Sequence, residues 1–380
     1  MTGPTPVRCP AIEHPDLPLA DPADLRPLLA RLAENRPVEE DEAFPLGTLR
    51  ADGRVDLCKQ GLGPAGAALL LPAAVASPHA EHLLLGTNAL ADDGIRTLAG
   101  FLRGAHGLHT LYLGCNRIGP DGALALASAL TDDATVRALW LKRNPLFEDG
   151  ARTLAALLRR NTALRTLDLV NTGIGADGIR LLLDALLVRE RPLERIFLGG
   201  NGLTAEAAPL LAALIRDAGV RELYVPANHL GDEGAAILAA AAAAADPARP
   251  VRLGLGGNGI GVRGARALAA ALGGIEALDL GRTLSERSLG AAGNHPGDEG
   301  AYALAAALPG SPLRRLDLRH TGITGRGAKS LLAALPEDAP LEHIGLGPGT
   351  PRRVKRSFAE RLRPVRAAHP DVRAIGSVYR

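Results

Sequence analysis

The sequence predicts an α/β horseshoe solenoid, with a parallel β-sheet on the concave face and α-helices on the convex face. One pattern, Leu-x-Leu-x-x-Asn-x-Ile-Gly followed by Asp/Glu-Gly and an alanine-rich run, recurs along most of the 380 residues. The first five copies start 28 residues apart. A fixed period of this length is typical of stacked units that share one continuous core. Apolar residues make up 47% of the chain and its net charge is +2, which excludes a wholly disordered chain.

Each copy begins with a short segment that predicts a β-strand. In LYLGCNRIG at Leu111 and LWLKRNPLF at Leu139, two leucines stand two positions apart. Alternate residues of a strand point to the same face, so we expect the leucines in the core and the residue between them on the opposite face. The copies start at Val55, Leu83, Leu111, Leu139, Leu167, Ile196, Leu223, Leu253, Leu278, Leu316 and Ile344.

An asparagine follows the strand in most copies. Its side-chain amide both donates and accepts hydrogen bonds, so stacked copies can satisfy loop backbone that would otherwise be buried without partners. We expect a structural ladder of Asn88, Asn116, Asn144, Asn201, Asn228 and Asn258.

The second half of each copy predicts an α-helix. An acidic residue and a glycine such as Gly122 stand eleven residues after the start of a copy, where negative charge favours a helix N-terminus. Leucines four apart, such as Leu126 and Leu130, then form one apolar face. Strand, loop and helix in turn predict strands inside an arc and helices outside it.

The two ends of the chain do not repeat, and a solenoid needs both ends covered. We expect an N-terminal cap over residues 1–53, repeats over 54–349 with an insertion at 284–294, and a C-terminal cap over 350–380. The insertion emerges from a loop at the end of a strand. It therefore either borders a binding surface or is an addition that the fold tolerates without a function. In the last segment we expect a helix near 354–367 and a strand near 372–378.

These residues resemble the leucine-rich repeat superfamily, in particular its ribonuclease-inhibitor-like class. The resemblance covers about residues 55–349 and recurs in register about ten times. It implies a horseshoe whose concave strands and strand-end loops bind other proteins. The chain lacks the dense cysteines of the inhibitor, so the resemblance does not imply ribonuclease binding.

Four of the ten aromatic residues of the chain occupy the same position, between the two core residues of a strand. Aromatic side chains that face solvent are typical of binding surfaces. Basic residues follow one of them directly. We therefore predict a partner-binding strip of Tyr112, Trp140, Lys142, Arg143, Phe197 and Tyr224. The alternative is that the rings simply suit strands and pack against one another. Arg195 and Arg252 on neighbouring strands predict a mixed polar surface.

The function predicted from this strip is a non-enzymatic scaffold for protein–protein interaction. A second hypothesis is a regulator of a GTPase, because activators of the Ran type look similar at the level of the repeat. A third is association with nucleic acid through the basic segment 351–366, whose apolar spacing equally predicts a capping helix.

No catalytic residue, cofactor or metal site is predicted. The sequence from Gly254 to Gly259 matches a dinucleotide fingerprint, but its glycines occupy ordinary repeat positions. His82 and His109 fall on adjacent strands without a third ligand nearby. No signal peptide or membrane span is recognisable. Three cysteines without CxxC spacing favour a cytoplasmic protein, and the Ala-, Arg- and Gly-rich composition favours a bacterial one.

Overall fold

The computed structural model describes residues 6–16, 18–283 and 289–378. Its contacts group the chain into two compact units. The N-terminal unit consists of Pro6–Leu193 together with Ala368–Arg380, and the C-terminal unit consists mainly of Glu194–Ala367. The last residues of the chain therefore belong to the unit formed by its beginning.

The sheet of the N-terminal unit opens with a short antiparallel hairpin and continues as parallel strands. Strands β1 to β3 pair antiparallel, and β3 to β7 pair parallel in sequence order. The strands are β1 (Glu42–Ala43), β2 (Thr48–Leu49), β3 (Arg54–Asp56), β4 (His82–Leu84), β5 (Thr110–Tyr112), β6 (Ala138–Trp140) and β7 (Thr166–Asp168).

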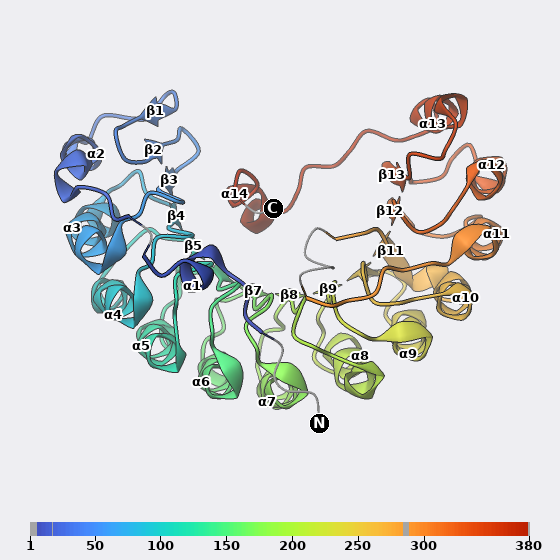
Figure 1. Ribbon diagram of the computed structural model, residues 1–380, viewed down its shortest axis with the longest axis horizontal. Coiled ribbons are helices and arrows are strands. Elements are labelled where there is room, and N and C mark those ends of the chain that lie inside the picture. The colour runs from blue at the N-terminus through green and yellow to red at the C-terminus, as the bar shows by residue number, and fades with distance from the viewer. Residues whose placement is uncertain (1–5, 17, 284–288, 379–380) are drawn as a thin grey trace. The chain divides into compact units, whose positions relative to one another are not determined.

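A helix follows each parallel strand of this unit and covers one side of the sheet (Figure 1). These helices are α3 (Gly63–Ala76), α4 (Ala91–Leu102), α5 (Pro120–Leu130), α6 (Phe147–Arg160) and α7 (Gly175–Leu187). Before the repeats come α1 (Pro10–Glu13), η1 (Pro22–Leu25) and α2 (Arg26–Ala33). The short helix α14 (Pro370–Ala374) lies on the opposite side of the strands (Figure 1).

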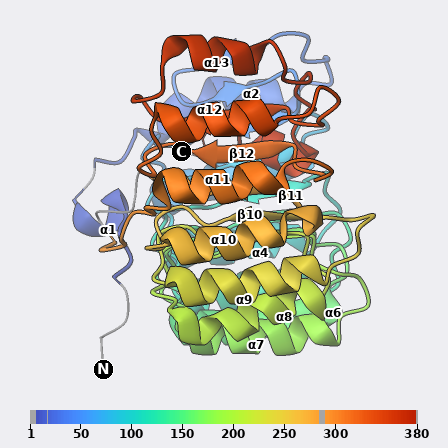
Figure 2. The same cartoon turned by 90° about the vertical axis from the view of Figure 1, so that its right-hand side faces the viewer.

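The C-terminal unit repeats the same alternation, and Figure 2 shows its helices stacked one above another. Its strands are β8 (Arg195–Phe197), β9 (Glu222–Tyr224), β10 (Val251–Gly254), β11 (Ile275–Asp279), β12 (Arg315–Leu318) and β13 (His343–Leu346). Its helices are η2 (Ala205–Ala207), α8 (Ala208–Arg216), α9 (Gly231–Ala243), α10 (Val262–Ala270), η3 (Leu272–Gly274), α11 (Gly297–Ala307), α12 (Gly325–Ala334) and α13 (Arg352–Ala359).

The core lies between the strands and their helices, as the leucine spacing predicts. Leu111 and Leu113 from one repeat and Leu126 and Leu130 from its helix are all fully buried. Each repeat buries one sheet side and one helix stripe, so neighbouring repeats share a continuous apolar layer. The predicted α/β leucine-rich repeat solenoid is confirmed within each unit.

Asparagines at the predicted ladder positions are buried and bridge consecutive repeats. The amide of Asn116 donates to the carbonyls of Leu85 (2.9 Å) and Leu113 (3.0 Å). Its side-chain oxygen accepts from the backbone N–H of Asn88 at 2.8 Å. The interrupted repeat supplies the same group through Asn294, whose oxygen accepts from Asn258 at 3.0 Å. Within the insertion, residues 284–288 lie outside the described residues.

The C-terminal segment differs from its prediction. The helix near 354–367 is shorter, from Arg352 to Ala359, and a helix rather than a strand forms after Pro370. Pro364 disfavours helical backbone just before it, which limits α13. Pro370 stands at the first position of α14, where its fixed φ suits a helix, and the His369 side chain accepts from the backbone N–H of Asp371. The alternation of Val372, Ala374 and Gly376 therefore does not produce a strand.

A disulfide bond that the sequence did not predict joins Cys9 to Cys115, with the Cα atoms 5.6 Å apart. It holds the N-terminal segment against the loops that follow the strands. Asn171 strengthens this attachment, because its side chain accepts from the N–H of Arg8 (2.8 Å) and donates to the carbonyl of Pro6 (2.9 Å). Among the described residues, no helix is both long and apolar enough to span a membrane.

Candidate functional site

The strand face of the N-terminal unit, meaning the side of its sheet away from the helices, carries two aligned rows of side chains. The strand register places Arg54, His82, Thr110, Ala138 and Thr166 in the first row. The second row, two residues further along each strand, consists of Asp56, Leu84, Tyr112, Trp140 and Asp168.

The last residues of the chain, 368–378, lie across the first row, and we call them the C-terminal segment. At one end, the Thr166 hydroxyl on β7 donates to the Asp371 carboxylate at 2.7 Å. At the other end, Arg54 on β3 donates to the Ser377 hydroxyl at 3.1 Å. The segment therefore passes over β4, β5 and β6 between these contacts. Ile375, in its middle, is only 1% exposed.

The prediction that Trp140 forms part of an accessible strip is wrong in this structure, because its side chain is fully buried. Its neighbours Leu139 and Leu141 point into the core, so the indole lies on the strand face. Other parts of the molecule therefore cover this ring, and the C-terminal segment lies on the same face between Thr166 and Arg54. Tyr112, on the adjacent strand, is likewise buried.

A cavity of about 580 Å³ opens beside these rings, at the ends of strands β3 to β6. Four parts of the chain build its walls: α1, the β1–β2 hairpin, the strand-end loops and the C-terminal segment. We call it the strand-end pocket. It is lined by Pro10, Ala43, Phe44, Pro45, Gly47, Thr48, Asp56, Cys58, Lys59, Gln60, Gly86, Thr87, Tyr112, Cys115, Lys142, Arg143, Ser377 and Val378.

Lys142 lines the strand-end pocket, and the stem of its side chain packs against Gly114. A Cβ at Gly114 would overlap its side chain, and a Cβ at Gly86 would overlap the Tyr112 ring, so both glycines make room for these groups. The ammonium nitrogen lies 5.7 Å from the centroid of the Tyr112 ring, within reach of a cation–π interaction. Burial lowers the pKa of Lys142 to about 8, although the Asp168 carboxylate opposes this shift.

Arg143 lines the same pocket, so three residues of the predicted strip, Tyr112, Lys142 and Arg143, lie together there. Cys58 also lines it, as a free thiol. Burial raises the pKa of this thiol, with Asp56 adding to the effect, so it stays protonated and is a poor nucleophile.

The other two predicted aromatic residues belong to the C-terminal unit. Phe197 and Tyr224 stack with ring centroids 4.6 Å apart and an angle of 7° between the ring planes. The Tyr224 hydroxyl donates to Glu222 at 3.0 Å. Phe197 is buried and Tyr224 is half-buried. The rings thus pack against each other, as the alternative interpretation of the aromatic pattern expected.

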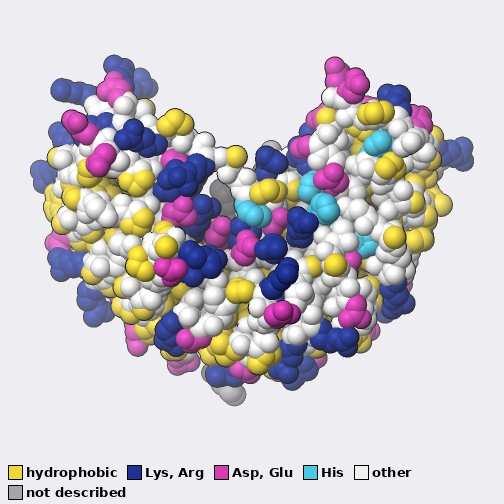
Figure 3. All heavy atoms as spheres, turned by 180° about the vertical axis from the view of Figure 1, so that it is seen from behind, with side chains coloured by type: hydrophobic (Ala, Val, Ile, Leu, Met, Phe, Trp, Pro, Cys, Tyr) yellow, Lys and Arg dark blue, Asp and Glu magenta, His cyan; other side chains and the backbone are white. Residues whose placement is uncertain are grey.

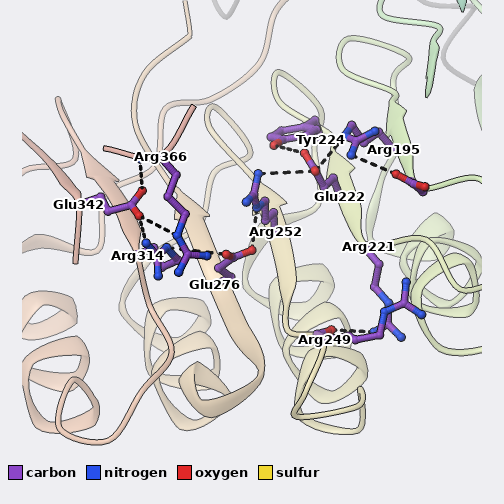
Figure 4. A network of polar contacts seen from close by, with 11 residues as sticks. Arg195, Arg221, Glu222, Tyr224, Arg249, Arg252, Glu276, Arg314, Glu342 and Arg366 are labelled. Carbon is purple, nitrogen blue, oxygen red and sulfur yellow. Dashed lines mark hydrogen bonds and ion pairs between the residues drawn. The ribbon is translucent and has the colours of Figure 1, made fainter. Parts of the chain in front are cut away.

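Charged residues form a continuous ladder across the strand face of this unit (Figure 4). Basic and acidic side chains alternate from strand to strand, and Figure 3 shows side chains of both signs, blue and magenta, on the face seen from behind. The ion pairs are Arg195–Glu222 (2.8 Å), Glu222–Arg252 (3.5 Å), Arg252–Glu276 (2.8 Å), Glu276–Arg314 (3.9 Å), Arg314–Glu342 and Glu342–Arg366 (3.6 Å). Arg195 and Arg252 are therefore engaged in internal pairs.

The basic segment after the last repeat is also used internally. Arg361 donates to the carbonyls of Leu332 (3.1 Å) and Leu335 (3.2 Å), and Arg363 donates to that of Ala339 at 3.3 Å. These contacts close the end of the C-terminal unit around α12. They favour the capping interpretation of the segment over a nucleic-acid surface.

Among the described residues, no three or more His, Cys, Asp and Glu side chains are grouped so that they could hold a metal ion. His82 instead shares a hydrogen bond of 2.9 Å with the hydroxyl of Thr110 on the next strand.

Comparison with known proteins agrees with the repeat architecture. A family model described as a leucine-rich repeat matches residues 106–127, 160–183 and 311–332. The crystal structure of a complex of Rad7 and Elc1 in yeast is similar with a TM-score of 0.54 and 17% identity, over 90% of this chain and 81% of that one. This likeness shows the fold alone.

A second similar structure is that of the leucine-rich repeat-containing protein LegL7 from Legionella pneumophila. It is 18% identical with a TM-score of 0.47, over 77% of this chain and 92% of that one. No curated protein sequence matches the chain.

Proposed function

Since the chain is a leucine-rich repeat protein, we propose that it is a non-enzymatic scaffold whose strand faces bind a polypeptide segment of a partner protein. The ribonuclease-inhibitor-like subclass stays a prediction.

One observation carries this proposal: the strand face of the N-terminal unit already holds a polypeptide, the C-terminal segment of the same chain. The segment is attached through polar contacts at its two ends, Asp371 with Thr166 and Ser377 with Arg54. Between them it buries Ala374 and Ile375. An apolar centre with a polar rim is the composition of a peptide-binding surface.

The predicted partner-binding residues keep a place in this proposal with changed roles. Trp140 and Tyr112 form the floor on which a segment rests, so they contact a partner only after the C-terminal segment has moved. Lys142 and Arg143 lie beyond its end, in the strand-end pocket. Phe197 and Tyr224 support a second surface, on the C-terminal unit.

The experiment removes the segment and supplies it as a separate peptide. A variant that ends at Ala367 is mixed with a fluorescently labelled peptide of residues 366–378, and binding is followed by fluorescence polarisation. We expect saturable binding to the shortened protein. We expect binding to the full chain to be about tenfold weaker or more, because the tethered segment competes at a high effective concentration.

The matched variants are Thr166→Val and Thr97→Val in the shortened protein. Thr166 bonds Asp371, whereas Thr97 is half-buried on α4 and bonds the carbonyl of Asp93 in its own helix. Thr166→Val should weaken peptide binding about tenfold or more, as expected for one lost hydrogen bond to a charged group, and Thr97→Val should leave it unchanged. A shortened protein that keeps its far-ultraviolet circular dichroism and thermal transition but binds no peptide would contradict the proposal.

The two alternative functions receive less support. Regulation of a GTPase rests on the resemblance of the repeats alone, and nucleic-acid binding needs arginines that already bond carbonyls in the C-terminal unit. The rate of GTP hydrolysis by candidate GTPases, measured with and without this protein, tests the first function. Gel retardation of nucleic-acid probes at low salt tests the second.

A further inference from the structure

We propose that the strand-end pocket of the N-terminal unit binds a phosphate group carried on a small organic ligand or on a side chain of a bound segment. Net positive charge, a positioned ammonium group and a cavity larger than phosphate itself support this site.

The charges that line the pocket favour a dianion. Lys59, Lys142 and Arg143 contribute three positive charges, and Asp56 contributes one negative charge. Asp56 is partly compensated, because its carboxylate accepts from the N–H of Cys58 at 3.1 Å and lies 3.7 Å from Arg50. A phosphate monoester carries a charge of about −1.5 to −2 at neutral pH, which matches the balance of +2 better than a carboxylate does.

Lys142 is held in place before any ligand arrives. Its stem lies over Gly114 and its ammonium over the Tyr112 ring, and the side chain is 8% exposed. Binding therefore requires little further ordering of this side chain. The ammonium has already lost most of its water, so a phosphate oxygen that reaches it restores an interaction that burial removed. A lysine with a strongly shifted pKa in a cavity is a common property of functional sites.

The other walls provide hydrogen-bonding groups and room. Thr48, Thr87, Ser377 and Gln60, which carry hydroxyl or amide groups, line the same pocket. Its volume of about 580 Å³ is in the usual range of sites for small ligands. A lone phosphate would leave most of this space empty. Phe44 and the neighbouring prolines offer apolar surface to the body of a ligand.

The test measures ligand affinity of the full chain by isothermal titration calorimetry. The probes are inorganic phosphate, O-phosphoserine and serine, and the variants are Lys142→Met and Lys329→Met. Met keeps an unbranched apolar stem over Gly114, and Lys329 is an exposed lysine of α12 in the other unit. We expect O-phosphoserine to bind, serine not to bind, and Lys142→Met to lose about tenfold or more in affinity for the phosphate probes. Lys329→Met should match the unaltered protein.

The pH dependence adds a second readout. The groups facing Lys142 are Asp168, Arg143, Cys58 and Lys59, with Tyr112 beneath it. Affinity should fall above pH of about 8, as Lys142 of the free protein loses its proton. It should also fall below about pH 6, as the phosphate gains one.

A phosphoserine-containing peptide, added as a further probe, distinguishes the source of the phosphate. Tighter binding of the phosphopeptide than of free O-phosphoserine indicates recognition of a phosphorylated segment, and equal or weaker binding of the phosphopeptide indicates a site for small organic phosphates. Equal binding of serine and O-phosphoserine, or a folded Lys142→Met variant with unchanged affinity, would overturn the proposal. Neither result affects the expected binding of the unphosphorylated peptide of residues 366–378. The proposed scaffold function is therefore tested independently of the phosphate site.

Discussion

Single residues of the N-terminal unit carry polar groups into places that water cannot reach. Lys142 holds an ammonium against an aromatic ring, and Asn116 places an amide between two repeats. The first arrangement costs free energy because the charge is desolvated. The second offsets its burial by satisfying backbone groups that would otherwise lack partners. The two residues therefore respond to substitution in opposite ways.

Replacing Lys142 by Met should stabilise the protein near neutral pH. The pKa of Lys142 is about 8 in the folded protein against 10.5 for an ordinary lysine, so the unfolded chain binds more protons between these values. Stability of the unaltered protein therefore rises with pH across this window. The free energy of unfolding of Lys142→Met should exceed that of the unaltered protein near neutral pH. This difference should shrink by on the order of 3 kcal/mol between about pH 7 and 10.5, because one pKa unit corresponds to about 1.4 kcal/mol. Urea unfolding at both pH values measures it. A constant difference would contradict the burial of the charge, and Lys329→Met provides the baseline.

Replacing Asn116 by Ala should destabilise the protein strongly. The substitution leaves the carbonyls of Leu85 and Leu113 and the N–H of Asn88 without their side-chain partner. We expect a loss on the order of 3 kcal/mol or more in the free energy of unfolding, at about 1–3 kcal/mol for each buried group left unsatisfied. Ser128→Ala, on the exposed side of α5 in the same repeat, should change little. Equal unfolding midpoints for the two variants would argue against the ladder.

At the level of elements, the repeats could be predicted from the sequence and the chain ends could not. Strands and helices follow from leucine spacing, because each repeat must bury one face of each. The C-terminal segment instead contacts β3 and β7, which lie hundreds of residues earlier in the chain. The local alternation of apolar and polar residues does not reveal such distant contacts. The partner of Cys115 is equally non-local. The position of Tyr112 between two core residues and the charge of Lys142 placed both in the predicted partner-binding strip. Only the structure shows that Lys59 and the C-terminal segment line the same pocket.

The disulfide between Cys9 and Cys115 should stabilise the N-terminal unit. It joins residues 106 positions apart, so it restricts a long loop of the unfolded chain. Cys9→Ser should lower the free energy of unfolding by about 2–5 kcal/mol under oxidising conditions. Thermal unfolding with and without a reducing agent measures this effect. Cys58→Ser, which removes the free thiol, is the control. A transition that the reducing agent leaves unchanged would show that the bond does not form in solution, which would agree with the predicted cytoplasmic location.

For the molecule as a whole, the covalent connection of the two units matters most. The chain leaves the C-terminal unit at Ala367 and ends on the strand face of the N-terminal unit. A tethered ligand is present at a high local concentration, so a partner for that face must compete with it. The strand face of the C-terminal unit carries the charge ladder instead, so the two units present surfaces of different chemistry.

The fluorescence of Trp140 tests whether a polypeptide covers the strand face of the N-terminal unit. This is the single tryptophan of the chain and is fully buried. We expect a blue-shifted emission for the full chain, a red shift when residues 368–380 are removed, and a return toward the original spectrum when the peptide of residues 366–378 is added. An unchanged emission in a folded, shortened protein would contradict it.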